Sequence, residues 1–168
     1  MLYNWNAAVD TFNTAYGETS VNYNAVYVTF SGHRRGICPA GWHLPSDAEW
    51  TQLENYVGSQ SEYTCSGNSS YIAKALASTE GWNTYTYNCV VGNDPSSNNA
   101  TGFSAVPAGV CYGSSFSIAG NSAYFWSSTQ YASSPYYAYY RDLYYDNAGV
   151  SRYIYDKYYG YSVRCLRD

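Results

Sequence analysis

The chain has 168 residues, about one domain's worth, with a net charge of −4, only 12% charged residues and 20% aromatic residues. The negative net charge argues against nucleic-acid binding, because a nucleic-acid-binding domain carries a basic patch. The small fraction of charged residues argues against intrinsic disorder. No apolar run approaches the roughly 18 residues of a membrane helix, and no secretory leader is visible at the first residues.

The N-terminal third contains one strand-like stretch at 25–30 and then the clearest local signal of the chain. Ser46 and Glu49 have the spacing of a capping box, and Asp47 suits the positive end of a helix dipole. Apolar residues follow at the spacing of a helix face, at Trp50, Leu53 and Val57. The pattern predicts a helix that begins after Ser46 and ends at Gly58.

The middle of the chain is less regular. Residues 70–78 are predicted to form a second helix with an apolar face, followed by a break at Gly81. Residues 83–101 are polar and read as a long exposed loop. Strand patterns follow at 103–106 and 124–128, and three more strand-like runs lie near the C-terminus.

Period-two alternation divides the C-terminal strands into two faces. Leu143 must face a core, which defines an inward set: Tyr139, Arg141, Leu143, Val150, Arg152 and Ile154. The outward set is Tyr140, Asp142, Tyr144, Ser151, Tyr153 and Tyr155. Residues 146–149 supply the turn of a hairpin, and the last strand directs Tyr161, Val163 and Cys165 inward. Inward arginines predict a fixed network with carboxylates or backbone carbonyls.

Thirteen of the 23 tyrosines lie between Tyr124 and the C-terminus, more than a core needs, because a buried hydroxyl requires a partner. Tyrosine mixed with Ser, Asn, Gly and Asp is the composition of an antibody paratope. Cross-strand tyrosine pairs that only stabilise a sheet are the alternative. The predicted ligand-binding residues are Tyr131, Tyr136, Tyr137, Tyr140, Asp142, Tyr144, Ser151, Tyr153, Tyr155 and Tyr158.

Enzymatic readings find little support. The chain has two histidines, His33 and His43, and no GxSxG, HExxH, P-loop or dinucleotide motif. His43 is expected to be structural, and Glu49 is expected to be a cap rather than an acid catalyst. The aspartates lack EF-hand spacing. The sequence therefore predicts no catalytic residue, no metal and no cofactor.

The five cysteines form no CxxC pair, which argues against a zinc ribbon or a thioredoxin-like motif. Two disulfides and one free thiol would fit an oxidising compartment, whereas five reduced cysteines would fit the cytosol. The low lysine content and the abundance of Tyr, Ser, Asn and Gly favour an exported surface protein.

Four segments carry a resemblance to a known family: GICPAGWHLPSDAEWTQLENYVG (36–58), GFSAVPAG (102–109), WSSTQY (126–131) and YGYSVRCLRD (159–168). In this order they resemble the Fibrobacter-type major paralogous domain family, from about Leu2 to the C-terminus. That family is similar to C-type lectin-like folds. The resemblance implies an α+β single domain over 1–168, with two helices packed on small antiparallel sheets.

The resemblance also implies a disulfide between Cys38 and Cys165, which leaves Cys65 with Cys89 as a second candidate pair and Cys111 unpaired. Members with this ending look like variable proteins of diversity-generating retroelements, which mutate adenines in a C-terminal coding stretch, here about 127–160. Asn codons can then become codons for Tyr, Ser or Asp, the types found in the outward set. Ca²⁺-dependent sugar motifs are absent.

The function expected from these observations is non-enzymatic binding of a protein or a cell-surface ligand, a glycan included, with no nucleic-acid partner and no membrane insertion. The expected location is extracellular, on a cell surface or on a virion. A carbohydrate-binding or adhesive module of fixed sequence is the alternative, because aromatic faces also stack on sugars. An enzyme related to formylglycine-generating proteins is the weakest reading, since no reactive cysteine pair is found.

Overall fold

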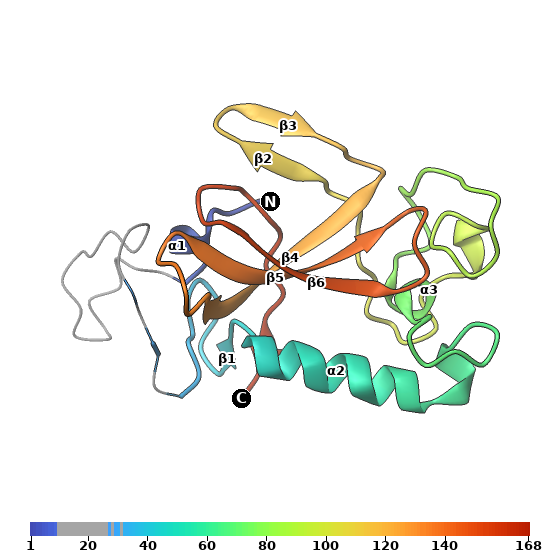
Figure 1. Cartoon of the computed structure of the whole chain (residues 1–168), viewed down its shortest axis with the longest axis horizontal. Coiled ribbons are helices and arrows are strands. Elements are labelled where there is room, and N and C mark those ends of the chain that lie inside the picture. Colours follow the sequence, from blue (N-terminus) through green and yellow to red (C-terminus); the bar gives the residue numbers. More distant parts are fainter. Residues whose placement is uncertain (10–26, 28, 31) are drawn as a thin grey trace.

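The computed structural model describes residues 1–9, 27, 29–30 and 32–168, so half of the strand-like stretch predicted at 25–30 lies outside the described residues. The architecture is α+β, with few helices and small antiparallel sheets (Figure 1). One long helix, α2 (Asp47–Ser59), runs below a three-stranded sheet in this view, and a short hairpin rises above the sheet. No helix in the described part of the chain is long and apolar enough to cross a bilayer.

The three-stranded sheet is antiparallel, in the order β4 (Ser122–Gln130), β5 (Tyr137–Tyr144) and β6 (Val150–Asp156). The predicted turn at 146–149 connects β5 to β6, which confirms the hairpin. The other elements are short: α1 (Trp5–Ala8), β1 (Trp42–His43), η2 (Ser61–Tyr63), α3 (Ala73–Leu76), η3 (Pro95–Ser97), β2 (Val110–Tyr112), β3 (Ser115–Ser117) and β7 (Leu166–Arg167). β1 pairs with β7, and β2 pairs with β3.

Helix α2 begins as predicted but continues one residue beyond the predicted end. The Ser46 hydroxyl accepts a hydrogen bond from the Glu49 N–H (3.3 Å), and the Glu49 carboxylate accepts one from the Ser46 N–H (2.8 Å), so the capping box is confirmed. Gly58 lies inside the helix and does not end it. A Cβ at Gly58 would lie 2.5 Å from the Ser69 carbonyl oxygen, so close packing explains the glycine.

The second helix is much shorter than the predicted 70–78, because α3 covers only Ala73–Leu76. Beyond Leu76 the backbone turns to a strand-like partner: Ala105 donates to the Leu76 carbonyl (2.8 Å) and accepts from the Ser78 N–H (2.8 Å). This bridge is also all that remains of the strand predicted at 103–106. A distant backbone partner therefore overrides the helical pattern.

Two buried clusters lie on opposite sides of the sheet. One packs α2 and α3 against it, through Trp50, Val57, Ile72, Ala73, Leu76, Phe125 and Leu143 among others. The second gathers both chain ends on the other side, through Trp5, Val9, Leu44, Trp126, Tyr140 and Tyr161 among others. The backbone of Tyr3 pairs with that of Tyr161, which holds the terminal segments together there.

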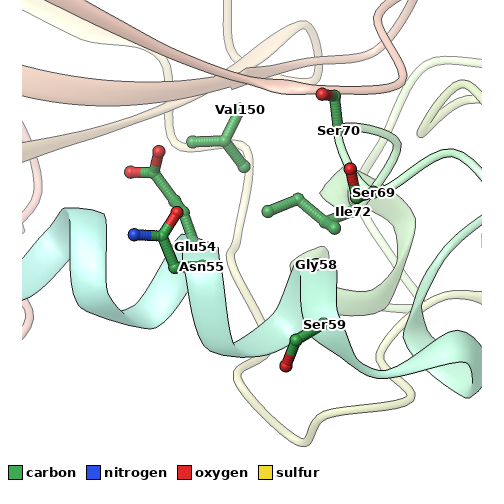
Figure 2. A pocket seen from close by; sticks show the side chains of 8 residues that line it. All are labelled: Glu54, Asn55, Gly58, Ser59, Ser69, Ser70, Ile72 and Val150. Atoms are coloured by element: carbon green, nitrogen blue, oxygen red, sulfur yellow. The ribbon is translucent and has the colours of Figure 1, made fainter.

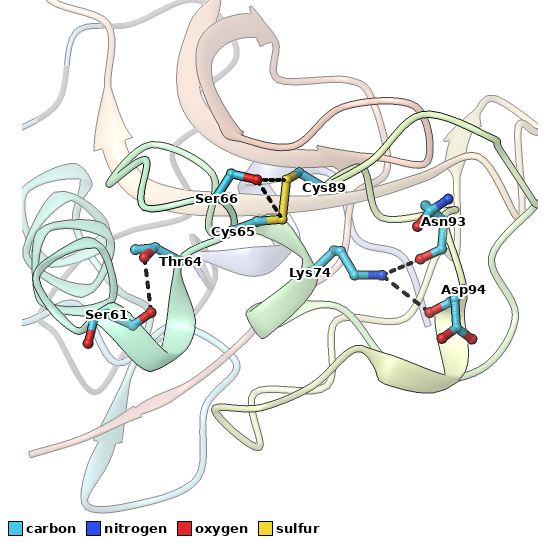
Figure 3. The surroundings of a disulfide bond; sticks show 8 residues. All are labelled: Ser61, Thr64, Cys65, Ser66, Lys74, Cys89, Asn93 and Asp94. Carbon is cyan, nitrogen blue, oxygen red and sulfur yellow. Dashed lines mark hydrogen bonds between the residues drawn. A yellow bond between two sulfur atoms is a disulfide. The ribbon is translucent and has the colours of Figure 1, made fainter.

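Two disulfides are present, Cys38–Cys165 and Cys65–Cys89, and Cys111 is free, which confirms both pairings. The second bridge joins the loop after η2 to the polar loop at 83–101 (Figure 3). Beside it, the Lys74 ammonium donates hydrogen bonds to the carbonyls of Asn93 and Asp94 and so helps to fix the same loop. Disulfides are typical of proteins that fold in an oxidising compartment.

Candidate functional site

Exposed and half-buried tyrosines lie on the open side of β6 and on the segments beside it. Tyr153 and Tyr155 are 58% and 42% exposed, and they alternate with Arg152, which reaches the α2 side of the sheet. Tyr112 of the β2–β3 hairpin is 59% exposed and stacks on Tyr159 with ring centroids 4.7 Å apart. Tyr159 in turn contacts Tyr155 at 4.6 Å. We call Tyr112, Tyr153, Tyr155 and Tyr159 the tyrosine surface.

The prediction that Tyr140 and Asp142 are exposed is wrong, because each is only 8% exposed. Both lie on the same face as Tyr153, as the alternation predicts, but the β4 side of that face is covered. The Tyr161 ring lies 5.0 Å from Tyr140 and 4.4 Å from Trp126. Rings from the C-terminal segment and β4 thus bury the centre of the face and leave its β6 edge open.

The remaining predicted residues fall into three groups. Tyr144 and Ser151 are half-buried on the same face as Asp142. Tyr136, just before the start of β5, and Tyr158, just after the end of β6, are exposed. Tyr137 shares the alternation of Tyr139 and so lies on the α2 side, where half-buried Tyr131 also contacts the Tyr139 ring at 5.8 Å. The ten residues do not form one continuous surface.

The α2 side of the sheet carries the charge network that the inward arginines predicted. Fully buried Arg141 donates to Asp47 (2.7 Å), to the Thr51 hydroxyl (2.9 Å) and to the Glu54 carboxylate. Arg152 also pairs with Asp47 (2.7 Å). Burial of Asp47 opposes its ionisation, but hydrogen bonds from Arg152 and Arg141 hold its pKa below the usual value.

A separate polar cluster surrounds His43 beneath α2's first turn. The buried imidazole contacts Asp168 (Nδ1–Oδ1 2.6 Å) and Glu49 (Nε2–Oε1 2.9 Å), and its ring stacks on His33 at 3.9 Å. Burial alone would lower the pKa of His43, but hydrogen bonds to Asp168 and Glu49 raise it. Through these contacts His43 links Asp168 to the first turn of α2.

In the described part of the chain, one group of side chains has the spacing of metal ligands: His33, His43 and Glu49, whose ligand atoms lie within 4.8 Å of one another. Both ring nitrogens of His43 already face carboxylates, and the two rings are nearly parallel (18°). Two stacked rings cannot both direct a nitrogen lone pair at one ion. Hydrogen bonding and stacking account for this cluster.

A polar pocket of about 440 Å³ lies between the C-terminal half of α2 and the start of β6 (Figure 2). Its apolar floor is formed by Ile72 and Val150. Polar groups of Glu54, Asn55, Ser69 and Ser70 surround that floor, whereas the Ser59 hydroxyl donates to the Tyr56 carbonyl (2.7 Å). The size is that of a small-molecule site, and the lining offers donors and acceptors for hydroxyl groups. No pattern in the sequence predicts this pocket.

Tyr112 and Tyr159 belong to the tyrosine surface but are not among the residues predicted from the sequence. Tyr112 comes from residues 110–117, where Tyr-Gly-Ser-Ser separates two short strand-like runs, a recognisable hairpin pattern. Tyr159 lies in the turn after β6, where alternation does not apply. Its place beside Tyr112 follows from the bridge between Cys111 and Gly160, which no local pattern predicts.

Fold and site together define a small disulfide-bonded α+β domain whose ordered sheet supports an accessible aromatic surface. The chain belongs to the Fibrobacter succinogenes major domain family, whose model matches residues 1–167. Comparisons with curated proteins and with solved structures returned no match.

Proposed function

We propose that this chain is a non-enzymatic binding domain that presents a tyrosine-rich recognition surface, varied by a diversity-generating retroelement, to a protein or cell-surface ligand. The observation that carries the proposal is the tyrosine surface itself. Tyr112 and Tyr155 are accessible and in contact through Tyr159, and Tyr153 is exposed two residues before Tyr155 on the same face of β6. Rigid tyrosine rings supply contact area at a small entropic cost.

The two sides of the sheet support the idea of a variable surface on a constant scaffold. Arg141 is fixed by three side chains of α2, so its replacement would disturb the fold. Tyr153 and Tyr155 contact mainly other rings at the edge of the molecule, so their replacement would be tolerated. A retroelement needs this separation, because it alters many positions at once.

The C-type lectin-like fold is part of the same proposal. We infer a C-type lectin-like arrangement from three features: paired chain ends, a disulfide from the segment before β1 to the segment before β7, and α2 packed on a small sheet. Two disulfides support display outside the cytosol, on a cell surface or a virion.

Sequencing this locus in sibling strains tests the proposal, together with a search for a template repeat and a reverse-transcriptase gene nearby. We expect substitutions to concentrate at Tyr144, Ser151, Tyr153 and Tyr155, at adenine-containing template codons, with Arg141 unchanged. Substitutions spread evenly over both faces, or an identical surface in every strain without a template repeat, would contradict diversification.

The polar pocket favours a second candidate, a carbohydrate-binding module of fixed sequence. Hydroxyl and amide groups around an apolar floor suit the alternating polar and apolar surfaces of a sugar. Titration with a panel of methyl glycosides, followed by NMR, tests this candidate. Sugar binding that Asn55→Ala weakens and Tyr153→Ala leaves unchanged would favour the pocket over the tyrosine surface.

A further inference from the structure

Asp142 is the only charged side chain that residues 122–126, β5 and β6 place on the ring-lined face of the sheet. It pairs in register with Tyr124 on β4 and with Ser151 on β6. On its own strand it lies between Tyr140 and Tyr144. The carboxylate is therefore surrounded by aromatic rings and one hydroxyl.

The carboxylate of Asp142 lacks a full set of partners. It is more than nine-tenths buried, and its Oδ1 has no hydrogen-bond partner among the described residues. The ion pairs of the described chain engage Asp47, Glu49, Glu54 and Asp168, and none engages Asp142. Burial raises the pKa of Asp142 to about 6, although a hydrogen bond from Ser151 opposes this.

A buried carboxylate without a counter-charge destabilises a fold, and such costs are concentrated at functional sites. The neighbouring arginines do not relieve it, because Arg141 and Arg152 point to Asp47 on the opposite face. The missing partner is therefore a cation with N–H donors. Tyrosine rings beside the carboxylate add a second attraction, since a cation is stabilised over an aromatic face.

We propose that Asp142, with the rings of Tyr124, Tyr144 and Tyr153, binds a cationic side chain of a protein ligand, a lysine or an arginine. This inference rests on the proposed function and assigns the chemistry of the ligand in this sequence variant. Tyr153 is exposed and Tyr144 is half-buried, so both stand at the rim, and the ring of Tyr153 must turn aside to admit the cation. The methylene stem of the ligand side chain would pack on these rings.

Probe titrations of the ¹⁵N-labelled full chain test this proposal, followed by NMR at pH 7.5 and low salt. The probes are the N-acetyl methylamides of lysine, arginine and norleucine, together with choline. We expect lysine and arginine to bind at least fivefold more tightly than norleucine, with shifts centred on Asp142 and Tyr153. Choline should bind more weakly than lysine, because it has no N–H to donate to Oδ1.

Two matched variants locate the effect. Asp142→Asn should reduce the preference for lysine over norleucine to less than twofold, whereas Asp146→Asn, which removes an exposed charge in the β5–β6 turn, should leave it intact. Thermal unfolding verifies that both variants are folded. No charge preference in the native chain, an unchanged preference in Asp142→Asn, or choline bound as tightly as lysine would overturn the proposal.

The outcomes also separate this inference from the proposed function. Equal binding of all probes at the tyrosine surface would contradict the cation site but not the proposed recognition surface. A clear charge preference in a locus that never varies would support the cation site and contradict diversification. In a varied locus, siblings with an uncharged residue at position 142 should lose the preference for cations.

Discussion

The two faces of the three-stranded sheet are built from alternate residues of the same strands. On one face the buried charge has a full set of partners, and on the other it does not. On the α2 side, Arg141 is surrounded by Asp47, Glu54 and Thr51, and every member has a partner. On the other side, Asp142 lies among rings with one oxygen unpaired. A satisfied network stabilises a scaffold, whereas an unsatisfied group keeps binding capacity for a partner.

The largest expected effect is on the scaffold face. Arg141→Ala should lower the free energy of unfolding by about 3 to 5 kcal/mol, because it leaves the carboxylates of Asp47 and Glu54 without their buried partner. Chemical denaturation measures this change. A loss similar to that of Arg152→Ala, whose side chain is 46% exposed, would show that Arg141 is not the buried centre of this network.

The next largest effect separates the buried centre of the ring-lined face from its open edge. Tyr140→Ala should cost about 3 kcal/mol of stability, because it opens a cavity beside Trp126 and Tyr161. Tyr140→Phe is the matched control and should retain most of that stability. If Tyr140→Ala is as stable as Tyr153→Ala, the assignment of Tyr140 to the core is wrong.

The two faces should also respond to pH with opposite signs. The pKa of Asp142 is raised to about 6 in the folded chain, so the folded state binds its proton more tightly than the unfolded state does. Its stability cost is absent below pH 4, grows as the pH rises to about 6, and reaches about 2 to 3 kcal/mol above that. Asp142→Asn should therefore stabilise the protein at pH 7.5 and have little effect at pH 3.5.

Asp47 behaves in the opposite way, since its pKa is lowered in the folded chain. Its contribution to stability is present at neutral pH and is lost as the pH falls through the lowered pKa. Asp47→Asn should therefore destabilise the protein at pH 7.5 and have less effect in acid. Thermal unfolding of both variants against pH measures the contrast, and curves of the same sign would contradict it.

The smallest expected effect is at the tyrosine surface. Tyr153→Ala should change the free energy of unfolding by no more than about 0.5 kcal/mol, because the side chain is largely exposed. The same substitution should cost about 1 to 2 kcal/mol of ligand binding if Tyr153 is a central contact. A variant that loses stability instead would place Tyr153 in the scaffold.

Local patterns were enough for several of these features. The capping box of Ser46 and Glu49 is contained in four residues, so its geometry follows from the sequence alone. Alternation along β5 correctly separated Arg141 from Tyr140, and the resemblance to a known family implied the bridge between Cys38 and Cys165. Each of these depends on neighbouring residues or on a shared motif.

Which residues share a face is thus a property of the sequence, because side chains alternate along any strand. Whether that face meets solvent was decided by the tertiary structure alone. Tyr161 and Trp126 come from segments that are distant from Tyr140 in the sequence, and their rings bury it. A bridge between the distant residues Cys111 and Gly160 brings Tyr112 beside Tyr159, and the β6 edge of the face stays open. Burial depends on contacts between distant segments, and period-two alternation carries no information about them.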